Sequence, residues 1–165
     1  MNTEDFIRMF GSGPIRALLD WSRIAEPEVI VHHDFHTSLD RLARMHTLWY
    51  ADPTGRLASY TDPTAAPLTV GQAAVLDMSD VPKRQQTLDV FTERAGRSTE
   101  PVQLVLAAYR LQDRRDVLLD GTHRAVAAVR ANACVTVFSF VLVGPADPGI
   151  LPDLSHYLPS ARSTQ

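Results

Sequence analysis

Hydrophobic and polar residues follow two different periods along the first fifty positions of the chain. Over residues 3–21 the apolar side chains recur every three or four positions, which predicts a helix that the glycines and proline of residues 11–14 divide in two. The β-branched run in PEVIVHHDF predicts a strand at residues 29–31. Helical spacing returns over residues 38–49, where a second amphipathic helix is expected.

The second half of the chain has a more regular pattern. Residues 51–69 are rich in Pro, Thr, Asp and Gly, which predicts turns around a short hairpin. The elements expected after them are a strand at 75–81, a helix at 82–96, strands at 101–111 and 116–120, a helix at 122–132 and a strand at 134–144. This order indicates a layered α/β fold of the α+β kind.

The chain of 165 residues is expected to form a single domain. Because the composition changes at the turn-rich stretch, residues 1–66 are predicted to be an N-terminal extension of helix and strand packed on a core at 67–147. Residues 148–165 contain several prolines and end in small polar residues. They are predicted to form a C-terminal arm that frays.

Composition and charge narrow the classes of function. The formal net charge of −3 does not favour non-specific binding to polyanions, so nucleic acid is not an expected partner. The single cysteine, Cys134, excludes an intrachain disulfide and a zinc site built from several thiolates. The N-terminus lacks the apolar segment of a secretory signal, and no apolar run reaches the length of a membrane span. A cytoplasmic protein with no membrane partner is therefore expected.

The stretch VLLDGTHRAVAAVRAN places five chemically distinct residues where a strand hands over to a helix. The helix N-terminus attracts anions, and Gly121 lets a bulky group approach the backbone. Thr122 can cap the helix or donate to a phosphate oxygen, and Arg124 can bind two oxygens at once. His123 can donate or shuttle a proton, and Asp120 can hold Mg²⁺. The same five residues also suit an ordinary turn with a solvated helix end.

Within this stretch, LLDGTHRAVAAV resembles the signature turn of the ParB/sulfiredoxin-like fold, and the resemblance covers residues 68–143. It implies a ParB/sulfiredoxin-like core, nearest to the free serine kinases, whose motif is Asp-Gly-x-His-Arg. By that resemblance Asp120–Arg124 would line a phosphate site for ATP or ADP with Mg²⁺. Thr122 replaces the cysteine of sulfiredoxins, and His123 stands where ParB partition proteins have glutamate, so neither of those activities is implied.

Two further sets of side chains are candidates for the same site. Lys83 and Arg84 begin the predicted helix at 82–96, where basic residues could bind phosphate, although exposed pairs of this kind also cover solvated helix faces. The resemblance does not place the catalytic carboxylate of the kinases. Asp80, Glu93 and Glu100 are the candidates for it.

The stretch VHHDFH is unusual in a strand. Alternation puts His32, Asp34 and His36 on one face, where they could hold a divalent metal or supply a catalytic acid or base. The alternative is a polar strand end that leads into the next helix. Whether the protein needs a metal stays open.

The expected function is that of a small-molecule enzyme that binds a phosphate or carboxylate at Asp120–Arg124. Its most concrete form is nucleotide-dependent phosphoryl transfer to a small hydroxylated metabolite. The first alternative is a nucleotide-independent biosynthetic enzyme (a cyclase, isomerase or lyase) of a specialised-metabolite pathway, with a histidine as acid or base. The second is a non-catalytic nucleotide-sensing or DNA-associated regulator.

Overall fold

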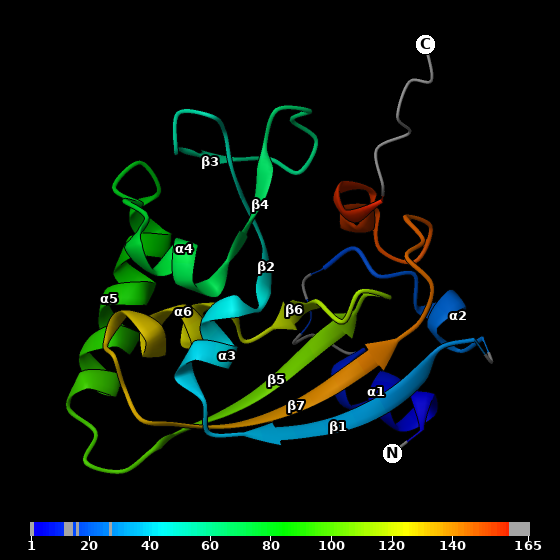
Figure 1. The fold of residues 1–165 in the computed structure, drawn as a ribbon, viewed down its shortest axis with the longest axis horizontal. Coiled ribbons are helices and arrows are strands. Elements are labelled where there is room, and N and C mark those ends of the chain that lie inside the picture. Colours follow the sequence, from blue (N-terminus) through cyan, green and yellow to red (C-terminus); the bar gives the residue numbers. More distant parts are fainter. Residues whose placement is uncertain (1, 12–14, 16, 27, 159–165) are drawn as a thin grey trace.

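A computed structural model describes residues 2–11, 15, 17–26 and 28–158. The described strands form one seven-stranded mixed sheet in the order β1-β7-β5-β6-β2-β3, with β4 paired to β2 (Figure 1). The strands are β1 (Ile30–His36), β2 (His46–Ala51), β3 (Leu57–Ala58), β4 (Ala66–Thr69), β5 (Val102–Arg110), β6 (Asp116–Asp120) and β7 (Val135–Val143). The helices are α1 (Thr3–Phe10), α2 (Trp21–Ile24), α3 (Leu39–Arg44), α4 (Val70–Val75), α5 (Pro82–Gly96), α6 (Thr122–Arg130) and the 3₁₀ helix η1 (Pro152–Tyr157).

β7 is the second strand of the sheet, parallel to β5 and antiparallel to the edge strand β1. β5 and β6 form an antiparallel hairpin, and β6 meets β2 in a parallel bridge between His46 and Val117. The combination of helices with a mixed parallel and antiparallel sheet confirms the α+β class predicted from the order of the elements. Residues 1–66 supply β1, β2 and β3 to the same sheet as the predicted core.

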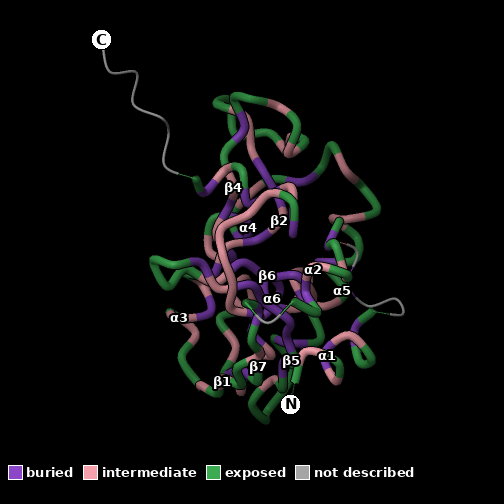
Figure 2. The backbone as a smooth tube through the Cα atoms, turned by 90° about the vertical axis from the view of Figure 1, so that its right-hand side faces the viewer, coloured by how far each residue is buried: buried purple, intermediate pink, exposed green. Residues whose placement is uncertain are grey.

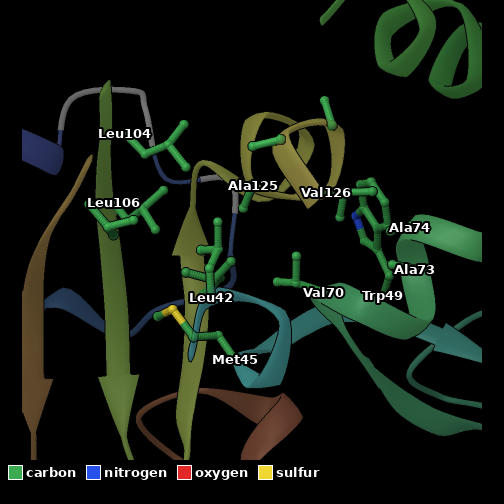
Figure 3. Close-up of a cluster of buried hydrophobic side chains, with 14 of the residues drawn as sticks. Leu42, Met45, Trp49, Val70, Ala73, Ala74, Leu104, Leu106, Ala125 and Val126 are labelled. Atoms are coloured by element: carbon green, nitrogen blue, oxygen red, sulfur yellow. The ribbon is translucent and has the colours of Figure 1, made fainter. Parts of the chain in front are cut away.

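Each face of the sheet carries its own apolar core, because neighbouring residues of a strand point to opposite faces. On one face, Leu106 and Leu118 pack with α3, α4 and α6 (Figure 3). On the other face, Ala107 and Val117 pack with α1, α2 and the C-terminal segment. Figure 2 shows the resulting buried interior along the strands. None of the described helices is long and apolar enough to span a bilayer.

Two predicted helices and one predicted strand differ from the structure. Residues 15 and 17–20 are not helical, because the Asp20 carboxylate caps the N–H groups of Ser22 and Arg23 and starts α2 at Trp21. The predicted break at residues 11–14 lies largely outside the described residues. The helix predicted at 38–49 ends at Arg44, and β2 replaces its second half. The predicted strand at 75–81 is wrong, since Val75 is the last residue of α4 and residues 76–81 form the coil and turn that lead into α5.

The C-terminal arm is also different from its prediction over residues 148–158. Ile150, Leu151 and Leu154 are buried in the core that α1 and α2 cover, and η1 closes that core at one end. Burial of these apolar side chains stabilises the segment against the sheet. The last residues of the predicted arm, 159–165, lie outside the described residues.

Candidate anion-binding site

The Asp120–Arg124 turn joins β6 to α6 through a glycine that no other residue can replace without strain. Gly121 has φ 87°, and a Cβ built on it would lie 2.3 Å from Cδ2 of Leu106. Gly121 itself is the N-cap, and its carbonyl accepts from the Ala125 N–H at 2.9 Å. Thr122 is therefore the first helical residue, and no described side chain caps the N-terminus of α6. The N–H groups at such a helix N-terminus attract anions.

A pocket of about 850 Å³ lies over this turn. It brings together the whole Asp120–Arg124 motif and the basic pair Lys83 and Arg84 at the start of α5. Residues from elsewhere in the chain also line it, among them Trp49 of β2, Tyr60, Thr87 and Phe91 of α5, and Asp153 of η1. The pocket thus has polar groups from parts of the chain that are far apart in the sequence.

Arg84 is the cation of the pocket that most needs a partner. Its guanidinium lies over the Trp49 ring, 4.6 Å from the centroid, and is half-buried. Burial lowers the Arg84 pKa, and no described carboxylate lies within ion-pair distance of it. A partly desolvated cation without a counter-ion is stabilised when an anion binds beside it.

Arg124 is held in place but not saturated. It donates to the Val105 carbonyl at 3.2 Å and to Asp120 Oδ2 at 3.3 Å. Both bonds use Nη2, so within the described part of the chain Nη1 and Nε have no acceptor and can bind an oxyanion. The side chains of this ion pair are partly exposed, 40% for Arg124 and 26% for Asp120. An exposed ion pair is weak, so a bound ligand can displace Asp120 from Arg124.

The Trp49 ring contacts residues at the N-termini of both α5 and α6. Its ring is edge-to-face with the His123 ring at 4.8 Å between centroids, while Arg84 covers it from the α5 side. The indole is 8% exposed, so its position is fixed by the core. The stacking therefore orients Arg84 and His123 toward a common space.

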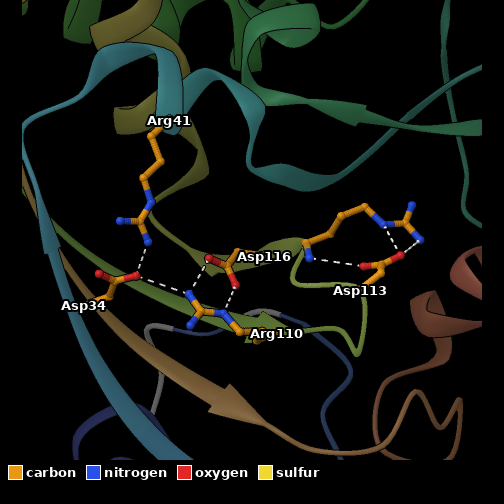
Figure 4. Close-up of polar contacts among 6 residues, drawn as sticks. Asp34, Arg41, Arg110, Asp113 and Asp116 are labelled. Carbon is orange, nitrogen blue, oxygen red and sulfur yellow. Dashed lines mark hydrogen bonds and ion pairs between the residues drawn. The ribbon is translucent and has the colours of Figure 1, made fainter.

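The candidate site predicted on β1 lies outside the pocket. His32, Asp34 and His36 do not line the pocket, and no group of three or more metal-binding side chains occurs among the residues that the structure describes. Asp34 instead pairs with Arg41 and Arg110, and Arg110 also binds Asp116 at 2.7 Å (Figure 4). Burial lowers the His36 pKa, with a further contribution from Arg41, so this imidazole stays neutral.

Removal of the Asp34 charge is expected to affect stability and not the pocket. Burial raises the Asp34 pKa, but hydrogen bonds from Arg110 and Arg41 outweigh burial and hold the pKa below its ordinary value. Its contribution is therefore full above about pH 4 and disappears as the pH falls through the lowered pKa. Asp34→Asn should lower the free energy of unfolding by about 1–2 kcal/mol at pH 7, and the difference from wild type should shrink as the pH falls below about 4 and through the lowered pKa.

Urea titrations at several pH values measure this difference. In the same variant, phosphate affinity should stay within about twofold of wild type, because Asp34 does not line the pocket. A tenfold loss of phosphate affinity would mean that β1 belongs to the site.

The predicted candidates for a catalytic carboxylate do not line the pocket either. Asp80 faces Arg56 at 4.0 Å, and Glu93 pairs with Arg97 at 2.6 Å. Glu93 and Glu100 line a neighbouring pocket of about 830 Å³. The carboxylates that the site does contain are Asp120 and Asp153.

Asp153 is the residue that the sequence interpretation missed, because it lies in the predicted arm. Its signal was the apolar spacing of Ile150, Leu151, Leu154 and Tyr157, which is typical of a segment that packs. No protein-family model, curated protein or solved structure compared with this chain matches it. Its function is therefore inferred from the pocket itself.

Proposed function

We propose that this protein is a cytoplasmic small-molecule enzyme whose pocket binds the phosphate or carboxylate group of its substrate. The observation that carries the proposal is that Lys83, Arg84, Arg124 and the N-terminal turn of α6 line one pocket. Arginine forks and helix N-termini are the groups that proteins use to bind oxyanions. A volume of about 850 Å³ suits a metabolite-sized ligand.

The balance of charge in the pocket supports an anionic ligand. Three cationic side chains face two carboxylates, and one of these, Asp120, is already paired with Arg124. Arg84 has no described counter-ion. The ligand that best completes this arrangement carries two or more negative charges.

The most concrete form of the proposal is phosphoryl transfer from a nucleotide to a small hydroxylated metabolite. Arg84 and Arg124 would stabilise the charge on the phosphate oxygens, and His123 would donate to the transferring group. Asp120 fits a Mg²⁺ site, because Mg²⁺ is commonly held by one or two carboxylates together with substrate phosphates. With ATP or ADP bound, that ion would neutralise the phosphates.

A second candidate is nucleotide-independent chemistry on a carboxylate-bearing metabolite. It is favoured by the position of His123, which lines the same pocket as Arg84 and Arg124 and whose ring contacts that of Trp49. Arg84 and Arg124 would hold the carboxylate, and His123 would act as the acid or base in place of the histidines of β1. The two candidates differ in whether a nucleotide binds.

Calorimetric titration of ATP, ADP, CTP and inorganic phosphate, with and without Mg²⁺, tests the proposal. We expect at least one of these ligands to bind the wild-type protein. Arg84→Ala and Arg124→Ala should each weaken that binding by about tenfold to a hundredfold, since each removes a charge-assisted contact. Arg44→Ala is the matched control, because Arg44 is exposed on α3 and lines neither pocket.

Each outcome points to a different conclusion. Nucleotide binding that is lost in both pocket variants would support phosphoryl transfer. Binding of phosphate but of no nucleotide would favour the second candidate. If none of the ligands binds, phosphate recognition and phosphoryl transfer are refuted, and only the carboxylate form of the proposal stands. If Arg44→Ala reduces binding as much as the pocket variants, the anion site is refuted.

A further inference from the structure

A buried carboxylate lines the same pocket as the basic residues without forming an ion pair with any of those that the structure describes. Asp153 is 6% exposed and lines the pocket from η1. Its Oδ1 accepts a hydrogen bond from the Tyr50 hydroxyl at 2.6 Å. Among the described residues no donor reaches Oδ2 and no cation lies within ion-pair distance of Asp153. One oxygen is thus fixed and the other is available to a ligand.

The hydrogen bond from Tyr50 does not satisfy this carboxylate. Burial raises the Tyr50 pKa, and the hydrogen bond to Asp153 raises it further, so the phenol keeps its proton and acts only as a donor. A buried carboxylate needs several donors or a cation to offset its lost hydration. Asp153 has one neutral donor, so a ligand that supplies a second donor is favoured.

Asp153 is held rigidly enough to select a ligand. Its helix is tied to β2 through Tyr50, whose ring lies 4.7 Å from that of His156. His156 Nε2 is also 2.7 Å from the Tyr60 carbonyl, in the loop between β3 and β4. Leu154 buries the other side of η1 in the core. A side chain fixed from three directions can discriminate between ligand groups at little entropic cost.

The pocket therefore has two poles. Lys83, Arg84 and Arg124 provide a cationic side, and Asp153 provides a separate acceptor on the wall formed by η1. We infer that the natural ligand is bipolar, with its anionic group at the three basic residues and an ammonium or hydroxyl group bound to Oδ2 of Asp153. This inference rests on the proposed anion site and adds the substrate class to it.

A metal ion does not explain Asp153 equally well. No group of three or more histidine, cysteine or acidic side chains is found among the described residues, so a divalent ion at Asp153 would have too few protein ligands, whereas the Mg²⁺ ion proposed at Asp120 would be completed by the substrate phosphates. A single carboxylate beside aromatic side chains suits an organic donor group. The neighbouring ring of Tyr60 adds an apolar surface for the carbon chain between the two poles.

Binding of two matched ligand series to the intact protein tests the inference. One series is ω-aminoalkyl phosphates with two to six carbons, and the other is alkyl phosphates of the same lengths. Calorimetry should show that, at one chain length at least, the amine binds wild type about tenfold more tightly than its methyl counterpart. In Asp153→Asn this preference should fall to about onefold, while the alkyl phosphate keeps its affinity within about twofold.

Hydroxyalkyl phosphates of the same lengths show which donor the pocket prefers. A preference for either the amine or the hydroxyl that Asp153→Asn removes supports the inference. Tyr50→Phe tests whether Asp153 binds the ligand or only stabilises η1. This variant removes the hydrogen bond from the Tyr50 hydroxyl to Asp153 and leaves the Asp153 carboxylate in place. It should keep most of the preference, and its melting temperature shows whether the fold is intact.

The two proposals fail in different ways. If neither series binds wild type, the anion site is refuted and Asp153 has no bipolar ligand to bind. If both series bind with equal affinity at every length, or if Asp153→Asn keeps the preference, the anion site stands and the role of Asp153 is refuted. A loss of affinity for both series in Asp153→Asn would assign Asp153 a structural role only.

Discussion

Gly121→Ala is expected to lower the free energy of unfolding by about 3 kcal/mol, and Gly55→Ala by only about 1 kcal/mol. Both glycines have a positive φ, of 87° and 82°, so both variants have the same backbone strain. They differ in space: a Cβ on Gly121 meets Leu106 at 2.3 Å, and a Cβ on Gly55 meets nothing within 4 Å. Leu106 is fully buried and cannot move aside freely.

Urea unfolding of the two variants measures this difference. In a Leu106→Ala background the same Gly121→Ala change should cost only about 1 kcal/mol, because the contact is gone and the two substitutions are not additive. If Gly121→Ala and Gly55→Ala destabilise the protein equally in the wild-type background, the close approach of the turn to β5 is wrong.

Pyridoxal 5′-phosphate is expected to react selectively with Lys83. Lys83 is the only lysine of the chain, and it lines the pocket with Arg84 and Arg124. A phosphate bound by the arginines would present the aldehyde to the Lys83 amine, and proximity accelerates formation of the imine. After reduction with borohydride, peptide mapping should find the adduct at Lys83, with any reaction of the terminal amine resolved separately.

The dependence of this reaction on the anion site is its control. Lys83→Arg keeps the charge and should abolish the internal adduct. Arg124→Ala should slow the reaction about tenfold, and inorganic phosphate should protect the wild-type protein. Equal rates in wild type and Arg124→Ala, without protection by phosphate, would show that Lys83 reacts merely as an exposed amine.

The second half of the fold could be predicted because local pattern and tertiary contacts agree there. The helix at 82–96 begins at Pro82, and the strands at 102–110 and 135–143 are rich in β-branched and apolar residues. The tight turn between β5 and β6 is marked by polar residues around Asp113. Each of these signals is local, so no knowledge of distant partners was needed.

The region around β2 could not be assigned from pattern alone. Leu42, Met45 and Trp49 share helical spacing, yet the chain leaves the helix at Arg44 and extends. The strand is stabilised by pairing with β4 and β6, and by a hydrogen bond from Thr47 Oγ1 to the Leu68 carbonyl at 2.9 Å. These partners are distant in sequence, and the apolar spacing of residues 38–49 alone is compatible with a helix or a strand.

The candidate site was predicted in part for a similar reason. Lys83 and Arg84 lie at the start of α5, the turn lies at the start of α6, and the two packed helices bring both sets into one pocket. Asp153 could not be placed, because its burial depends on contacts with Tyr50 more than a hundred positions earlier. The resemblance to the ParB/sulfiredoxin-like fold stays a prediction.

The position of β7 also determines when this protein can fold during its synthesis. β7 lies between β1 and β5, although about a hundred residues separate it from β1. Until residues 135–143 have been translated, β1 has no hydrogen-bonding partner in the sheet and β5 has an open edge. Closure of such long loops is entropically costly and slow. Until residue 143 has been made, the nascent chain therefore has open strand edges, and we expect a chaperone that shields such edges to reduce its aggregation.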